Sequence, residues 1–169
     1  MNTPIDIAIG VGSNIRPGAH VPAGIQALKT HFDDVAVSTL YRCAAVGFDG
    51  AAFINLVVLA RTAAPIQAVQ DTLRTIEADN GRALRARDGS RTLDLDLLLY
   101  GDVVYDDGVI RVPREDITDY AFVLAPLAEL WPQGVHPQRG ISYAALWQAA
   151  DAPDQLLTPI SWADLADSD

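Results

Sequence analysis

Residues 91–100, RTLDLDLLLY, form an apolar segment that is interrupted by two aspartates. Its length and its leucines predict a buried β-strand over residues 93–100. Because successive side chains of a strand point to opposite faces, Asp94 and Asp96 share one face and the leucines at 93, 95 and 97 share the other. The leucine face belongs in a core. The two neighbouring carboxylates then lie on a face that a ligand can use.

The segments around this strand predict an α+β protein. Strands are expected at 5–12, 35–42 and 53–62, and amphipathic helices between the first two and after the third. The order β-α-β-β-α-β is that of a ferredoxin-like sandwich, whose antiparallel sheet carries both helices on one face and leaves the other free. A C-terminal extension follows. It contains a hairpin turning near 107–108, a helix over 121–130 that Pro126 would break or kink, and a short helix over 141–150.

Length and composition indicate one domain, over residues 1–160, with a loose acidic tail over 161–169. The net charge of −10 argues against a general affinity for nucleic acid. A single cysteine excludes an internal disulfide and an all-cysteine zinc site. The N-terminus does not resemble a signal peptide, and apolar runs are too short to span a membrane. We therefore expect a cytoplasmic protein without a membrane partner.

The basic residues are concentrated just before the two aspartates. Four of the twelve fall within residues 81–91, GRALRARDGSR: Arg82, Arg85, Arg87 and Arg91. Two adjacent carboxylates repel each other and need compensation. Mg²⁺ prefers carboxylate oxygens and completes its shell with phosphates, which arginines also bind. The cluster thus indicates phosphoryl-type transfer, whereas the alternative is a structural Asp–Arg network on a solvated sheet face.

Several segments together resemble one enzyme family. The segment GSRTLDLDLLLYG, preceded by IEADNGR, resembles the signature of the 6-hydroxymethyl-7,8-dihydropterin pyrophosphokinases of folate biosynthesis. The agreement extends to IGVGSN, to YRCAAVGFDGAAFINLVV, and to RVP followed by AFVLAPLAEL. The resemblance implies a ferredoxin-like fold and transfer of pyrophosphate from ATP to the hydroxymethyl group of the pterin, with release of AMP. ATP and the pterin are the expected partners of a monomeric chain.

The resemblance also implies roles for individual residues. Asp94 and Asp96 would hold two Mg²⁺ ions that bridge the triphosphate, and Arg82 and Arg91 would close over the phosphates as further catalytic residues. The residues expected to bind the pterin are Cys43, Val46, Phe53, Asn55 and Phe122. Those expected to bind the nucleotide are Glu77, Arg82, Arg87, Arg91, Leu97, Arg111 and Arg114. A phenylalanine by itself is more often a core residue, but an amide at Asn55, inside an apolar strand, needs a polar partner.

Four positions depart from the pattern of the family. Asp88 stands where the family commonly has tryptophan, Arg114 where it usually has histidine, Tyr120 where it has arginine, and Arg74 where it has glutamine. These departures leave three alternatives: an active but diverged enzyme, a paralogue that uses another pterin-like alcohol, and a non-catalytic module that binds pterin or nucleotide.

Overall fold

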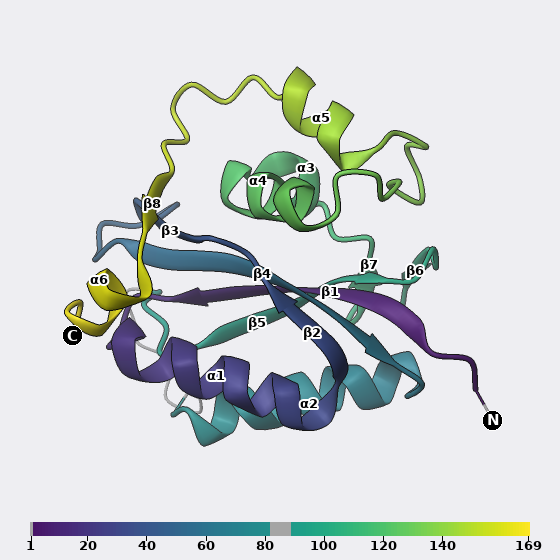
Figure 1. Cartoon of the computed structure of the whole chain (residues 1–169), viewed down its shortest axis with the longest axis horizontal. Helices are drawn as coiled ribbons and strands as arrows, with labels where there is room; N and C mark the ends of the chain where they lie inside the picture. The colour runs from purple at the N-terminus through teal and green to yellow at the C-terminus, as the bar shows by residue number, and fades with distance from the viewer. Residues whose placement is uncertain (1, 82–88) are drawn as a thin grey trace.

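A computed structural model describes residues 2–81 and 89–169 of the chain (Figure 1). Its centre is an antiparallel sheet of six strands in the order β5-β1-β4-β3-β8, with β2 also paired to β4. The strands are β1 (Ile5–Ser13), β2 (Asp33–Val37), β3 (Leu40–Cys43), β4 (Phe53–Thr62), β5 (Asp94–Tyr100) and β8 (Thr158–Ile160). The predicted ferredoxin-like α+β fold is confirmed.

Two long helices, α1 (Pro17–His31) and α2 (Ile66–Asp79), cover one face of the sheet (Figure 1). Leu28 of α1 and Leu73 of α2 are buried in one cluster with Ile9, Leu56 and Leu95 from the strands. Burial of these side chains is the main favourable contribution to folding on this side. Within the described part of the chain, none of the helices has both the length and the apolar character needed to span a membrane.

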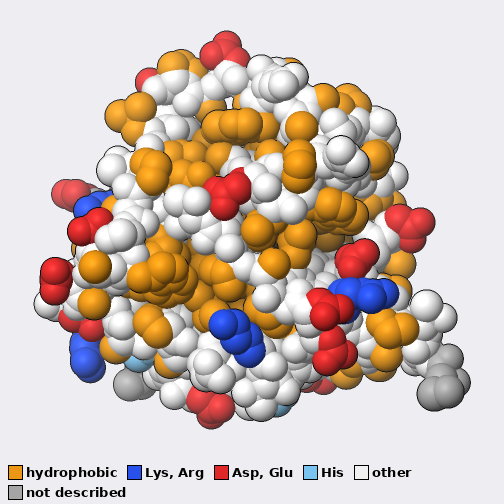
Figure 2. All heavy atoms as spheres, in the orientation of Figure 1, with side chains coloured by type: hydrophobic (Ala, Val, Ile, Leu, Met, Phe, Trp, Pro, Cys, Tyr) orange, Lys and Arg blue, Asp and Glu red, His pale blue; other side chains and the backbone are white. Residues whose placement is uncertain are grey.

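The opposite face of the sheet is partly covered as well. The helices α3 (Asp116–Asp119) and α4 (Ala121–Leu130) lie over it, and α5 (Tyr143–Ala149) packs on the outer side of α4 (Figure 1). Leu124 and Leu127 of α4 pack with Val57 and Leu99 in a second apolar cluster. Apolar side chains gather between this layer and the sheet on the surface seen in Figure 2. The prediction of a free face was therefore wrong for the part that α4 covers.

A bulge in β5 explains how its leucines serve both clusters. Ala8 pairs with Leu99 and Ile9 with Leu97, so Leu98 is the extra residue on β5. An extra residue reverses the alternation of side chains beyond it. Leu97 accordingly packs with α1 and α2, whereas Leu98 and Leu99 pack with α4. Asp94 and Asp96 precede the bulge and keep the predicted alternation.

Two other predictions are corrected in detail. The strand expected over 35–42 is divided into β2 and β3, because Ser38 lies between them and its hydroxyl accepts a hydrogen bond of 2.9 Å from the N–H of Val57. The helix over 121–130 is continuous through Pro126. The predicted hairpin is present as β6 (Tyr105–Asp106) and β7 (Arg111–Val112), and Gly108 supplies the positive φ of 86° in its turn.

The C-terminal residues are ordered parts of this architecture. β8 adds an edge strand beside β3, and α6 (Trp162–Ala166) packs Leu165 into the α1 core with 1% of its surface exposed. The carboxylate of Asp169 accepts a hydrogen bond of 2.7 Å from the N–H of Gly18. The expectation of a loose tail over 161–169 was therefore wrong, since one buried leucine and this bond hold the segment on α1.

Candidate active site

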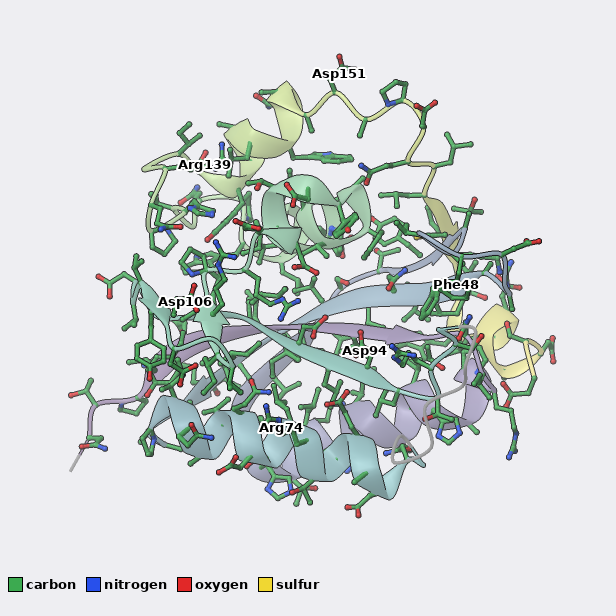
Figure 3. The ribbon with its side chains drawn as sticks, turned by 180° about the vertical axis from the view of Figure 1, so that it is seen from behind. Phe48, Arg74, Asp94, Asp106, Arg139 and Asp151 are labelled. Carbon is green, nitrogen blue, oxygen red and sulfur yellow. The ribbon has the colours of Figure 1, made fainter. Side chains whose placement is uncertain are left out.

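A cavity of about 210 Å³ lies on the face of the sheet opposite α1 and α2, where α4 leaves that face uncovered. Its floor is a row of paired positions on three strands, in which Gly12 of β1 lies between Asp94 of β5 and Asn55 of β4. Figure 3 labels Asp94 on the sheet and Phe48 on the loop between β3 and β4. The lining residues of the cavity are Gly10, Val11, Gly12, Ala44, Val46, Phe48, Phe53, Asn55, Leu56, Asp94, Asp96, Leu98, Asp116, Tyr120, Phe122 and Val123.

The two carboxylates of β5 lie side by side in this lining. Asp94 and Asp96 are both half-buried, and their neighbours on β1 are the glycines at 12 and 10. Because glycine has no side chain, neither β1 position adds one beside the carboxylates, and the amide oxygen of Asn55 lies against Gly12 and the side chain of Leu98 against Gly10. Asp94 and Asp96, which alternate along β5, therefore both face the cavity.

An arginine from outside the predicted basic loop compensates the pair. Nη1 of Arg114 lies 3.8 Å from Oδ1 of Asp96, and its Nε lies 3.2 Å from Oδ1 of Asp116. Burial lowers the pKa of Arg114, but the carboxylates of Asp96 and Asp116 raise it by more, so the guanidinium is charged. Sequence reasoning missed Asp116 as a lining residue, although its position two residues after the V-P-R segment was a usable signal.

Aromatic rings form two walls of the cavity. Phe48 and Phe53 meet edge to face, with ring centroids 6.2 Å apart and planes at 87°. Tyr120 and Phe122 are stacked, with centroids 5.0 Å apart and planes at 15°. All four residues line the cavity, and Phe53 and Phe122 are half-buried, so neither is a pure core residue. Flat apolar walls of this kind suit a planar heterocycle.

Asn55 places an amide group between these walls. It lines the cavity with 8% of its surface exposed, and its side chain lies next to the thiol of Cys43, which itself donates to the carbonyl oxygen of Tyr41 at 3.9 Å. Burial raises the pKa of Cys43, and the neighbouring amide of Asn55 opposes that rise. Cys43 is buried behind the cavity, while Val46 lies in its lining with 54% of its surface exposed. The amide of Asn55 thus lies between the thiol of Cys43 and the cavity.

Of the residues expected to bind the nucleotide, those within the described part of the chain are not in the lining of this cavity. The carboxylate of Glu77 accepts a hydrogen bond of 3.3 Å from the N–H of Leu95, and Leu97 is a core residue under α1 and α2. The guanidinium of Arg91 donates to the carbonyl oxygens of Gly89 and Ser90 at 2.9 and 3.1 Å.

Other predicted positions lie elsewhere or outside the described residues. Arg111 pairs with Glu115 at 2.7 Å in a second cavity of about 280 Å³, which Arg114 also lines. Arg74 lies on α2, on the far side of the sheet from α4 (Figure 3). The remaining positions, which fall within 82–88 and so outside the described part of the chain, are Arg82, Arg87 and Asp88.

The donor chemistry of the cavity suits a hard divalent cation. Within residues 2–81 and 89–169, no group of three or more histidine, cysteine or acidic side chains is arranged to hold a metal ion. Mg²⁺ does not need such a group, because one or two carboxylates, water and substrate phosphates complete its octahedral shell. Asp94 and Asp96 provide the carboxylates.

Comparison with known proteins connects this geometry to a family. A family model described as 7,8-dihydro-6-hydroxymethylpterin-pyrophosphokinase (HPPK) matches residues 8–132. Proteins named 2-amino-4-hydroxy-6-hydroxymethyldihydropteridine pyrophosphokinase are similar over most of the chain. The Pseudomonas aeruginosa protein is 37% identical over 131 residues, which cover 75% of this chain and 80% of its own. The Aquifex aeolicus protein is 30% identical over 133 residues, which cover 78% of this chain and 83% of its own.

Solved structures agree at the level of the fold. A Plasmodium falciparum HPPK-DHPS crystal structure superimposes with a TM-score of 0.71 over 87% of this chain, at 10% sequence identity. The match spans 45% of that longer protein. At this identity the likeness bears on the fold alone.

Proposed function

This chain belongs to the 7,8-dihydro-6-hydroxymethylpterin-pyrophosphokinase family, and we propose that the cavity between β5, β1, β4 and α4 is where it joins its two substrates. It is a pyrophosphokinase that transfers pyrophosphate from ATP to the hydroxymethyl group of the dihydropterin in folate biosynthesis. One observation supports placing both substrates in this cavity. The paired carboxylates of β5 and two aromatic walls line the same cavity.

The pterin ring occupies the side of the cavity between the aromatic walls in this proposal. Phe53 and Phe122 line it from β4 and α4, and Asn55 faces it from the floor. A pterin is flat and carries donors and acceptors along its edge, so ring stacking supplies affinity and an amide reads the edge. Cys43 acts through Asn55, because its thiol is buried behind that amide, and Val46 adds apolar contact at the rim.

The triphosphate of ATP lies over the other side of the cavity, next to β5. Asp94 and Asp96 would hold two Mg²⁺ ions, which when bound neutralise the charge of the phosphates. Arg114 orients the carboxylate of Asp96 through its contact of 3.8 Å. We propose that Arg91 exchanges its bonds to the carbonyl oxygens of Gly89 and Ser90 for bonds to phosphate oxygens. Glu77 and the backbone at Leu97 then lie toward the ribose and base.

The reaction is a displacement at the β-phosphorus. The hydroxymethyl oxygen of the pterin forms a bond to this phosphorus, the bond to the oxygen shared with the α-phosphorus breaks, and AMP leaves. The hydroxyl proton passes to solvent. The chain therefore acts by holding the two reactants in line and by stabilising charge, which is the usual basis of phosphoryl-type transfer. Arg82, Arg87 and Arg111 are proposed to bind phosphate or ribose oxygens during this step.

The test is AMP release from ATP with 6-hydroxymethyl-7,8-dihydropterin and Mg²⁺, measured together with pterin affinity by fluorescence titration. The proposed function predicts one AMP for each pyrophosphorylated pterin and loss of both products when EDTA removes Mg²⁺. Pterin binding without AMP would refute catalysis and favour a binding module. AMP formed only with a different pterin-like alcohol would favour a paralogue. This alternative is suggested by the stack of Tyr120 on Phe122, because Tyr120 stands where the family has arginine.

Three sequence-based expectations stay predictions: a cytoplasmic location, a monomeric state, and a single domain over 1–160.

A further inference from the structure

The C-terminal part of the chain lies beyond the residues matched by the family model, which end at 132. From α5 this part crosses the outer side of α4 and returns to the sheet at β8 (Figure 1). On the way it contacts the junction between α3 and α4, which lies at the rim of the cavity. A segment outside the family match thus touches the proposed acceptor site.

The contact is made by the side-chain amide of one half-buried residue, Gln155. Its Oε1 accepts a hydrogen bond of 2.7 Å from the N–H of Ala121, and its Nε2 donates one of 3.0 Å to the carbonyl oxygen of Asp119. Asp119 is the last residue of α3, and Ala121 is the first of α4. The ends of helices carry backbone groups without partners inside the helix, and α4 has no side-chain cap of its own at Tyr120. The amide of Gln155 supplies a partner to both ends.

The residue between the two bonded backbone groups is Tyr120. It stacks on Phe122 with ring centroids 5.0 Å apart, and both rings line the cavity. Fixing the backbone on both sides of Tyr120 restricts where its ring can lie. When the ring is already restricted before binding, less conformational entropy of the protein is lost as a ligand packs against it, and the affinity is higher.

We propose that Gln155 is a positioning residue for the acceptor wall, acting through the backbone of Asp119 and Ala121 on the Tyr120–Phe122 stack. This inference rests on the proposed placement of the pterin in the cavity. The carboxylates that face the triphosphate lie on β5, at the opposite side of the floor, whereas both side-chain hydrogen bonds of Gln155 go to the α3–α4 junction. Loss of the amide therefore weakens the binding of the pterin and leaves the binding of ATP unchanged.

The experiment compares Gln155→Ala and Gln155→Glu with Gln148→Ala, which makes the same side-chain truncation at an exposed position on α5. The probe is 6-hydroxymethylpterin, whose own fluorescence reports its Kd without turnover, and KM is measured for each substrate. We expect Kd and KM for the pterin to rise about tenfold in Gln155→Ala, as for the loss of two hydrogen bonds. KM for ATP stays within twofold. Gln155→Glu keeps the acceptor but sets a carboxylate oxygen against the carbonyl oxygen of Asp119, so pterin binding is weakened in this variant as well. Gln148→Ala matches the wild type.

A double-mutant cycle with Tyr120→Ala tests the route of the effect. If Gln155 acts through Tyr120, removing the amide adds little once the ring is gone, so the two changes are far from additive. An unchanged Kd for the pterin, equal weakening of both substrates, or full additivity with Tyr120→Ala would each overturn the inference. Failure of the wild type to release AMP would instead refute the proposed function, because the fluorescence titration does not depend on turnover.

Discussion

Replacement of Asp96 by asparagine separates the catalytic role of its charge from its role in folding. Asp94 and Asp96 are two residues apart on one strand, so their carboxylates are roughly 7 Å apart. At an effective dielectric constant of about 20 their repulsion is about 2 kcal/mol. The side chain of Asp96 is 33% exposed, and solvent screening reduces this repulsion to about 1 kcal/mol.

The same substitution also removes the ion pair with Arg114. The two atoms lie 3.8 Å apart, and both side chains are about one third exposed. Pairs of this exposure contribute at most about 1 kcal/mol. Because relief of repulsion and loss of the ion pair have opposite signs, the free energy of unfolding of the ligand-free protein changes by less than about 1 kcal/mol. Turnover, in contrast, depends on charge placed at the phosphates, and we expect it to fall by about 100-fold or more.

The assay is the initial rate of AMP release over a range of Mg²⁺ concentrations, paired with urea unfolding of the same preparations. Asp102→Asn is the matched control, since it neutralises an exposed acid just beyond the end of β5. The reasoning is refuted if Asp96→Asn retains turnover within tenfold of the wild type with the same dependence on Mg²⁺. It is also refuted if the substitution unfolds the protein, because a structural Asp–Arg network would then be the main role of the pair.

Three further substitutions test other parts of the structure. A Cβ added by Gly12→Ala would lie 3.0 Å from Oδ1 of Asn55 and would displace the amide. The Kd for the pterin, measured by fluorescence titration, should therefore rise severalfold. An unchanged Kd would argue against a role of this amide in pterin binding. Burial lowers the pKa of His136 below its usual 6.5. As the pH falls below about 6.5, the unfolded chain therefore binds the proton before the folded protein does, and the free energy of unfolding decreases. Thermal melts between pH 8 and 5 should show a smaller decrease of the melting temperature in His136→Asn than in the wild type. Leu165→Ala should lower the free energy of unfolding by about 3 kcal/mol in urea titrations, whereas Leu156→Ala, at a side chain 77% exposed, should leave it unchanged.

Local pattern was sufficient for the elements that carry the fold. The strand over 53–62 was predicted to the residue, and a helix follows it as expected. Alternation in the segment 93–97 correctly placed Asp94 and Asp96 on one face, because strand geometry assigns the side of each residue from its neighbours alone. The family itself was also readable, since its motifs are short and contiguous.

The rest of the site depends on contacts between distant parts of the chain. The Arg114–Asp96 pair joins residues 18 positions apart, and Gln155 meets Ala121 across 34 positions. Neither follows from periodicity, because the first requires the segment after β7 to be placed beside β5, and the second requires the path of α4 over the sheet. The tail over 161–169 was misjudged for the same reason. Its acidic composition indicated exposure to solvent, but Leu165 packs against α1 in the core.

The sequence alone thus determined the main strands, the two long helices and the shared face of the two carboxylates, because each of these follows from the repeat of a strand or a helix. Only the tertiary structure decided what surrounds those carboxylates: α4 closes part of the face, two aromatic pairs form the walls, and Arg114 balances Asp96. The physical reason is that burial and charge compensation depend on distances in space, which the chain sets only when its segments pack together.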